Sequence, residues 1–149
     1  MLKYRPFEMH CHTRHSDGTF LVPQLIESVA AYGYAGLALT DHNAVTGLLE
    51  VTEELQRKNN CLVLPGIEWT TFYGHLLVIG CDRFVDWRLV TPDTIDEALQ
   101  EIRAAGGIAG VAHPCEVGSP LMCGCNWEFR VKRWDLMDLS LIHISEPTR

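Results

Sequence analysis

Short apolar runs alternate with helix-forming segments over the first 112 residues, and this alternation restricts the fold more than any other feature. Five apolar runs have the length of strands: residues 7–12, 36–40, 61–67, 75–80 and 108–112. Three segments between them have the character of helices: about 23–32, 45–58 and 91–105. Thr94 and Glu97 have the spacing of a capping box in the third segment. Alternating strands and helices predict an α/β fold with a mostly parallel sheet.

The first apolar run ends in two imidazoles. His10 and His12 are two residues apart, so a strand would point both to the same face. His15 and Asp17 follow in the next loop. Imidazole nitrogen and carboxylate oxygen are common ligands of divalent metals. Taken alone, the His-x-His pair fits two solvated histidines on an edge strand as well as it fits a metal site.

Other predicted strands also end in ligand-type residues. His42, Glu68 and His113 each stand at or just after the carboxyl end of an apolar run. In a parallel barrel these ends converge on one rim, where sites form. His75 instead opens its strand, and it reaches that rim only if the strand is antiparallel to its predecessor or the hairpin folds over. Each residue alone fits a structural role, but several apolar strands ending in polar groups together favour a shared ligand.

Composition narrows the class of protein. The chain has 149 residues, 47% of them hydrophobic, which suffices for one domain with a sizeable core. No apolar run approaches the ~20 residues of a membrane helix, and residues 1–6 do not resemble a signal peptide. A formal net charge of −7 argues against non-specific nucleic-acid binding. We expect a cytoplasmic protein whose six cysteines stay reduced, without zinc-ribbon spacing.

Residues 139–149 resemble the translation of a sequencing adapter read into an open reading frame. We expect this tail to be foreign, so that residues 1–138 are one domain truncated at its C-terminus, and we leave His143 out of the site. The alternative is a native strand over residues 139–144 followed by coil. A closed (β/α) barrel takes roughly 250 residues, so the native-looking part is predicted to be the first half or more of a barrel.

The motifs together resemble the polymerase and histidinol phosphatase (PHP) domain superfamily. The matching pieces stand in the family's order: His10-x-His12 with Ser16-Asp17-Gly18, Thr40-Asp41-His42-Asn43, Pro65-Gly66-Ile67-Glu68, Gly74-His75 and Ala112-His113-Pro114. They cover nearly all of residues 7–114. Residues 68–75, with Asp86-Trp87-Arg88 downstream, resemble more narrowly the branch that includes carbaryl-type carbamate hydrolases.

The resemblance implies part of a distorted, TIM-like (β/α)7 barrel with a centre of two or three divalent ions. By analogy, His10 and His12 bind the first metal, Glu68 bridges the first and second, and His75 and His113 bind the second. The mixture of imidazole and carboxylate suits zinc, manganese or iron.

Two further residues complete the implied ligand set. Asp17 and His42 would serve a third metal position. The family's Asp-x-His pair near the end of the barrel is not in this sequence, as expected if the chain stops before it.

The implied reaction is metal-assisted hydrolysis. Glu68, His10 and His12 would act through a hydroxide generated at the metal centre. Arg83 or Arg88 would hold negative oxygens of the substrate, although surface solvation fits both arginines as well. Membership of the family would favour a small phosphoester as the substrate, with nucleic acid expected only as a nucleotide-type substrate. The resemblance of residues 68–75 to carbaryl-type hydrolases instead favours a carbamate or amide ester as the substrate.

Two other functions stay open. A catalytically silent PHP module, structural or metal-storing, would bind metal without hydrolysing either ester. Against it, every ligand expected within residues 7–114 is present. A proofreading domain associated with a DNA polymerase would need a much longer chain.

Overall fold

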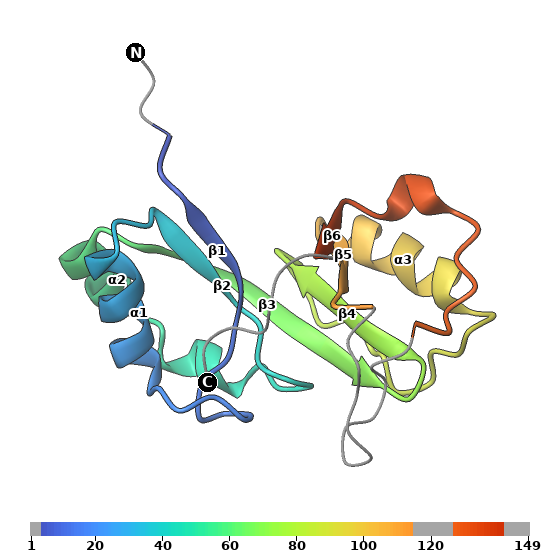
Figure 1. The fold of residues 1–149 in the computed structure, drawn as a ribbon, viewed down its shortest axis with the longest axis horizontal. Coiled ribbons are helices and arrows are strands. Elements are labelled where there is room, and N and C mark those ends of the chain that lie inside the picture. The colour runs from blue at the N-terminus through green and yellow to red at the C-terminus, as the bar shows by residue number, and fades with distance from the viewer. Residues whose placement is uncertain (1–3, 115–126, 142–149) are drawn as a thin grey trace. The chain divides into compact units, whose positions relative to one another are not determined.

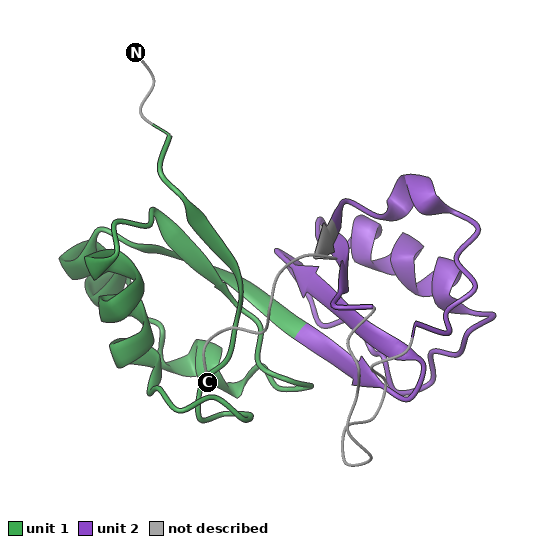
Figure 2. Ribbon diagram, in the orientation of Figure 1, with its two compact units in different colours: residues 1–67, 149 green, residues 68–148 purple. Residues whose placement is uncertain are grey.

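The structure is a computed structural model that describes residues 4–114 and 127–141. These residues form two compact units, unit 1 up to Ile67 and unit 2 from Glu68 onward (Figure 2). The division falls inside one strand. Each unit is therefore described by itself.

Unit 1 consists of parallel strands covered by helices. Its elements are β1 (Phe7–Cys11), α1 (Val22–Ala31), β2 (Gly36–Leu39), the 3-10 helix η1 (Thr46–Glu50), α2 (Glu53–Asn59) and the first part of β3 (Leu62–Thr71) (Figure 1). Gly36 of β2 pairs with Phe7 on one side and Leu62 on the other, both in parallel register. The parallel sheet predicted for this part of the chain is confirmed.

A single helix over residues 45–58 was the wrong prediction. The segment divides into η1 and α2 because Val51 and Thr52 are extended. Thr52 caps the second piece, since its Oγ1 accepts the Leu55 N–H at 3.1 Å. Asn60 ends α2 in the left-handed conformation that short polar residues tolerate.

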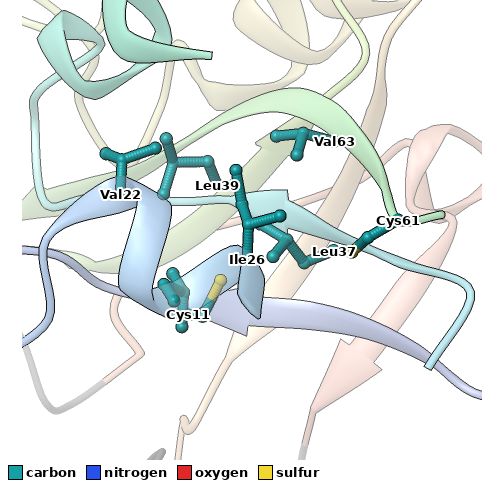
Figure 3. Packing of buried hydrophobic residues seen from close by; sticks show 8 residues of the cluster. Cys11, Val22, Ile26, Leu37, Leu39, Cys61 and Val63 are labelled. Atoms are coloured by element: carbon teal, nitrogen blue, oxygen red, sulfur yellow. The ribbon is translucent and has the colours of Figure 1, made fainter. Parts of the chain in front are cut away.

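The core of unit 1 lies between α1 and the sheet (Figure 3). Val22 and Ile26 of α1 pack against Leu37 and Leu39 of β2 and against Cys11 of β1. Burial raises the pKa of the Cys11 thiol well above its usual range, and the nearby carboxylates add to the shift. The S–H of Cys11 donates to the Ala38 carbonyl at 3.0 Å, so this thiol belongs to the core.

The three cysteine thiols that the structure describes are free and at least partly buried. Cys11 and Cys61 are buried, and Cys81 is partly buried, all without disulfides. The remaining cysteines lie outside the described residues: Cys115, Cys123 and Cys125.

Unit 2 is largely antiparallel, and a mostly parallel sheet was wrong for this part of the chain. Its elements are the end of β3, β4 (Gly74–Ile79), α3 (Ile95–Ala104), β5 (Ile108–Ala112), the 3-10 helix η2 (Trp134–Leu136) and β6 (Leu139–Leu141). Two residues join β3 to β4, a connection that only antiparallel strands allow. β4 is also antiparallel to β5, whereas β5 and β6 are parallel.

Two further sequence predictions need correction. Glu68 lies inside β3, which continues to Thr71, and not at the strand's end. The side chain of Thr94 makes no cap at the start of α3, because its Oγ1 accepts the Thr91 N–H at 2.9 Å. A glutamine reaching back to the backbone occurs instead at α1, where Gln24 Oε1 accepts the Leu21 N–H at 3.0 Å.

The element count agrees with the prediction over residues 4–114, which contain five strands and three α-helices. Residues 127–138 are irregular apart from η2, and residues 115–126 lie outside the described part. Residues 139–141 add β6, while the foreign origin expected for the tail stays a prediction. Among the described helices, none combines the length and apolar character needed to cross a membrane.

Candidate metal centre

The end of β1 and the start of the loop after β2 bring together four predicted ligands of unit 1, which we call the loop set: His10, His12, Asp17 and His42. The Nε2 atoms of His10 and His12 are 3.0 Å apart. The rings of His12 and His42 stack with centroids 4.4 Å apart. Asp17 Oδ1 lies 3.9 Å from His12 Nδ1 and 3.7 Å from His42 Nε2.

The loop set fits a divalent metal. Two imidazoles bound to one tetrahedral zinc at 2.0–2.1 Å would have nitrogens about 3.3 Å apart, close to the 3.0 Å between His10 and His12. His10 is buried, whereas the Asp17 side chain is 54% exposed. The set therefore combines fixed nitrogens with a carboxylate that solvent can reach.

The loop that carries Asp17 is held from β2 by Asp41, a residue that the sequence interpretation did not single out. Asp41 Oδ1 accepts the Thr13 N–H at 2.6 Å and the Ser16 hydroxyl at 2.7 Å, and Oδ2 accepts the Thr13 hydroxyl at 2.8 Å. Gly18 closes the loop so tightly that a Cβ there would lie 2.3 Å from the His12 carbonyl oxygen. Only glycine fits that position.

His15 turns to a different partner from the loop set. Its Nδ1 lies 2.8 Å from Thr46 Oγ1, and its Nε2 lies 2.7 Å from Glu50 Oε1. Both partners belong to η1. His15 thus ties the loop to that helix.

Unit 2 brings together the other three predicted ligands, which we call the strand set: Glu68, His75 and His113. Glu68 is fully buried, and its Oε1 lies 2.8 Å from His75 Nδ1 and 3.0 Å from His113 Nε2. The two imidazole rings meet edge to face with centroids 4.8 Å apart. One carboxylate and two imidazoles are a donor set that zinc, manganese and iron accept.

Strand direction explains how His75 joins this set. His75 opens β4, and the antiparallel register pairs it with Ala112 at the end of β5. His113 is the next residue, and the hairpin from β3 brings Glu68 beside both. The condition that the sequence left open for His75, an antiparallel strand, is met.

The backbone is strained where β5 ends. His113 has a φ of 28°, a left-handed value that costs most residues energy and that occurs often at functional sites. Asn43, directly after His42, has a φ of 49°. Asparagine tolerates this region better than most residues do.

The two predicted substrate-binding arginines are exposed, and each has a protein partner. Arg83 follows the end of β4, opposite to the end that carries His75, and donates to the Ala104 carbonyl at 3.1 Å. Arg88 donates to both oxygens of Asp86, at 2.8 and 2.6 Å. Its guanidinium lowers the pKa of that carboxyl to about 2. The described contacts do not bring either arginine to the strand set.

Comparison with known proteins identifies relatives. The family model of the PHP domain matches residues 8–106. The chain is 34% identical over 79 residues to a 3',5'-nucleoside bisphosphate phosphatase of Chromobacterium violaceum and 29% identical over 81 residues to the 5'-3' exoribonuclease Rnm of Escherichia coli. These matches cover 50% and 51% of this chain, but only 27% and 28% of the relatives. The chain thus spans little more than a quarter of the curated relatives' length.

Solved structures extend the likeness to the fold. A two-domain Bacteroides vulgatus protein, in which a PHP-like metal-dependent phosphoesterase is predicted, matches 74% of this chain and 35% of its own, with a TM-score of 0.58 and 19% identity. A Bifidobacterium adolescentis protein predicted to be a metal-dependent phosphoesterase matches 93% of this chain and 77% of its own, with a TM-score of 0.62 and 16% identity. At such identities the likeness concerns the fold, a mixed α/β structure consistent with part of a TIM-like barrel.

Proposed function

The chain belongs to the PHP domain family, and from that premise we propose that it is a metal-dependent phosphoesterase. The observation that carries the proposal is the strand set, in which a fully buried carboxylate oxygen lies within 3.0 Å of two imidazole nitrogens. A buried carboxylate is costly unless cations or donors surround it. A divalent cation is the partner that both the donor chemistry and the family favour.

Each set would bind metal through its own imidazole and carboxylate groups. His10 and His12 of the loop set would hold one divalent ion, and Glu68, His75 and His113 of the strand set would hold another. Asp17 and His42 would bind a third ion. The proposed metal is zinc, manganese or iron, which all accept this mixture of imidazole and carboxylate ligands. Bound divalent ions supply an activated water and polarise the ester oxygen.

The chain's own residues contribute orientation and charge. Glu68 and His75 lie within strands and His113 directly follows one, so the backbone holds all three side chains in place before any ligand arrives. This reduces the reorganisation needed during the reaction. The Asp17 side chain is 54% exposed, against 9% for His12 and 26% for His42, so it is the most accessible to solvent of these three ligands.

The proposed substrate is a small phosphoester, and a nucleotide-type one fits best. The relative from Chromobacterium violaceum acts on nucleoside bisphosphates by its name, and Rnm is a ribonuclease. Both are phosphoester hydrolases, so they favour a phosphoester over a carbamate. The likeness of residues 68–75 to carbaryl-type hydrolases, the seven-stranded barrel, the foreign tail after residue 138 and the cytoplasmic location remain predictions from the sequence.

A substrate comparison tests this function. The full chain is incubated with Mn²⁺ or Zn²⁺ and with a nucleoside 3',5'-bisphosphate, an aryl phosphate or an aryl carbamate. We expect phosphate release from the first two, loss of that release in Glu68→Gln, and its retention in His15→Ala, where the altered histidine contacts η1. Activity on the carbamate alone would contradict the proposal. Metal binding without hydrolysis of any ester would favour the silent module.

A further inference from the structure

Asp41 is a carboxylate that the proposed chemistry does not use. It is 1% exposed and lies two residues after the end of β2. Its three acceptor contacts all go to the loop between β1 and Asp17: the Thr13 N–H, the Thr13 hydroxyl and the Ser16 hydroxyl. Burying a carboxylate is costly unless donors such as these satisfy its oxygens, so the three contacts tie Asp41 firmly to the loop.

The sequence positions of these groups link them to the loop set. Thr13 directly follows His12, Ser16 directly precedes Asp17, and Asp41 directly precedes His42. Every residue of this hydrogen-bonded group is therefore the chain neighbour of a proposed ligand. A shift at any of them displaces that ligand's backbone.

We infer that Asp41 is a positioning residue, which fixes the loop set in ligand geometry and adds a negative charge behind the cation. The inference rests on the proposed metal-dependent function. Outer residues that orient metal ligands commonly change metal affinity about 10–100-fold when replaced. Asp41 has the burial and the contacts of such a residue.

A substitution at a neighbouring residue can disturb Asp41 without replacing it. A Cβ added at Gly47 of η1 would lie 3.1 Å from Leu39 Cδ2, 3.2 Å from Asp41 Oδ2 and 3.3 Å from a carbon of the His15 ring. Gly47→Ala therefore presses on the carboxylate, as well as on Leu39 and His15, without altering a proposed ligand. We expect it to weaken metal binding in the same direction as changes at Asp41, and less strongly.

Two substitutions at Asp41 separate geometry from charge. Asp41→Asn keeps the volume and the acceptor for the Thr13 N–H, and the Thr13 hydroxyl can turn to accept from the new amide. Asp41→Ala removes both the contacts and the charge. Asp138→Asn is the matched control, because Asp138 also accepts a backbone N–H, from Ala109 at 3.1 Å, but belongs to unit 2 and neighbours no proposed ligand.

The measurement is the Zn²⁺ dissociation constant of the full chain, from competition with a chromophoric chelator, together with the Tm in excess EDTA. We expect Asp41→Ala to weaken Zn²⁺ binding about 10–100-fold and Asp41→Asn to weaken it less. Asp138→Asn should lower the Tm and leave the dissociation constant unchanged. If Asp41→Ala does not fold in EDTA, Asp41→Asn and Ser16→Ala, both expected to weaken binding, decide the question.

Failure of the inference about Asp41 and failure of the proposed function would give different results. If the wild-type chain binds Zn²⁺ and all Asp41 and Ser16 variants bind it equally tightly, Asp41 is only structural and the inference is wrong. A lower Tm with an unchanged dissociation constant leads to the same conclusion. If the wild-type chain binds no Zn²⁺, the proposed function fails, and the role of Asp41 fails with it.

Discussion

The loop set of unit 1 and the strand set of unit 2 use the same kinds of side chain but are held in different ways. In the strand set, Glu68 and His75 lie within strands and His113 directly follows β5, and Glu68 contacts both histidines at 2.8 and 3.0 Å. In the loop set, Asp17 is more than 3.5 Å from His12 and His42, and its loop depends on Asp41. A site on strands is rigid before ligand binding, whereas a site on a loop needs an anchor.

This contrast predicts different consequences of substitution. Changes in the strand set should reduce stability and function together, because the residues are buried and bonded to one another. Changes at the exposed side of the loop set should reduce metal binding with little effect on stability.

Glu68→Ala should have the largest effect. It removes the buried acceptor that His75 and His113 share, so the free energy of unfolding in EDTA should fall by about 1–3 kcal/mol. Phosphoester hydrolysis should be lost. Glu50→Ala, which removes an exposed acceptor from His15, is the control. It should neither lower the free energy of unfolding by this amount nor abolish hydrolysis. Urea denaturation and an activity assay check both, and full activity in Glu68→Ala would refute the role of the strand set.

His12→Ala should weaken metal binding strongly, with the strand set left intact. Since outer residues alone change affinity about 10–100-fold, loss of a direct ligand should cost at least tenfold in the Zn²⁺ dissociation constant. His15→Ala is the matched variant three residues on, and its partners are Thr46 and Glu50. Equal Zn²⁺ affinities in the two variants would show that the loop set does not bind the ion.

The strain at His113 gives a smaller effect. Glycine adopts a φ of 28° more easily than alanine, so His113→Gly should be about 0.5–1 kcal/mol more stable to urea than His113→Ala. At Val111, inside β5 and without a positive φ, glycine should instead be less stable than alanine. The same order at both positions would mean that the backbone at His113 is unstrained.

Ion pairs away from both sets should have the smallest effect. Glu27→Gln breaks a contact of 3.4 Å with Lys58 on the exposed surface of unit 1 and should cost 0.5 kcal/mol or less, about the value of exposed pairs. Asp138→Asn should cost more, because Asp138 also accepts the Ala109 N–H. Urea denaturation of both variants checks the order.

The sequence predicted one unit better than the other, for a physical reason. In unit 1 each buried strand is followed by a helix, and apolar runs between helices predict parallel strands. In unit 2 the apolar run before Glu68 continues as strand through Thr71, because Trp69 also packs inside. Nothing in local periodicity marks a residue such as Glu68 as interior, so its position in mid-strand could not be predicted.

The candidate residues were predictable where their type is unusual for its place. Histidines and a glutamate beside apolar strands are conspicuous in the sequence, and the structure groups all seven within their own units. Asp41 was not conspicuous, because its partner Thr13 is 28 residues away and such contacts leave no local pattern. The partners of His15 on η1 were missed for the same reason.

The most direct test of the account is anomalous diffraction at the zinc edge from crystals of the full chain grown with Zn²⁺. Metal bound at both sets would give one peak about 2.0–2.2 Å from nitrogen atoms of His10 and His12 and another at that distance from an oxygen of Glu68. Peaks confined to other surface residues, with Glu68 bonded only to His75 and His113, would contradict the account.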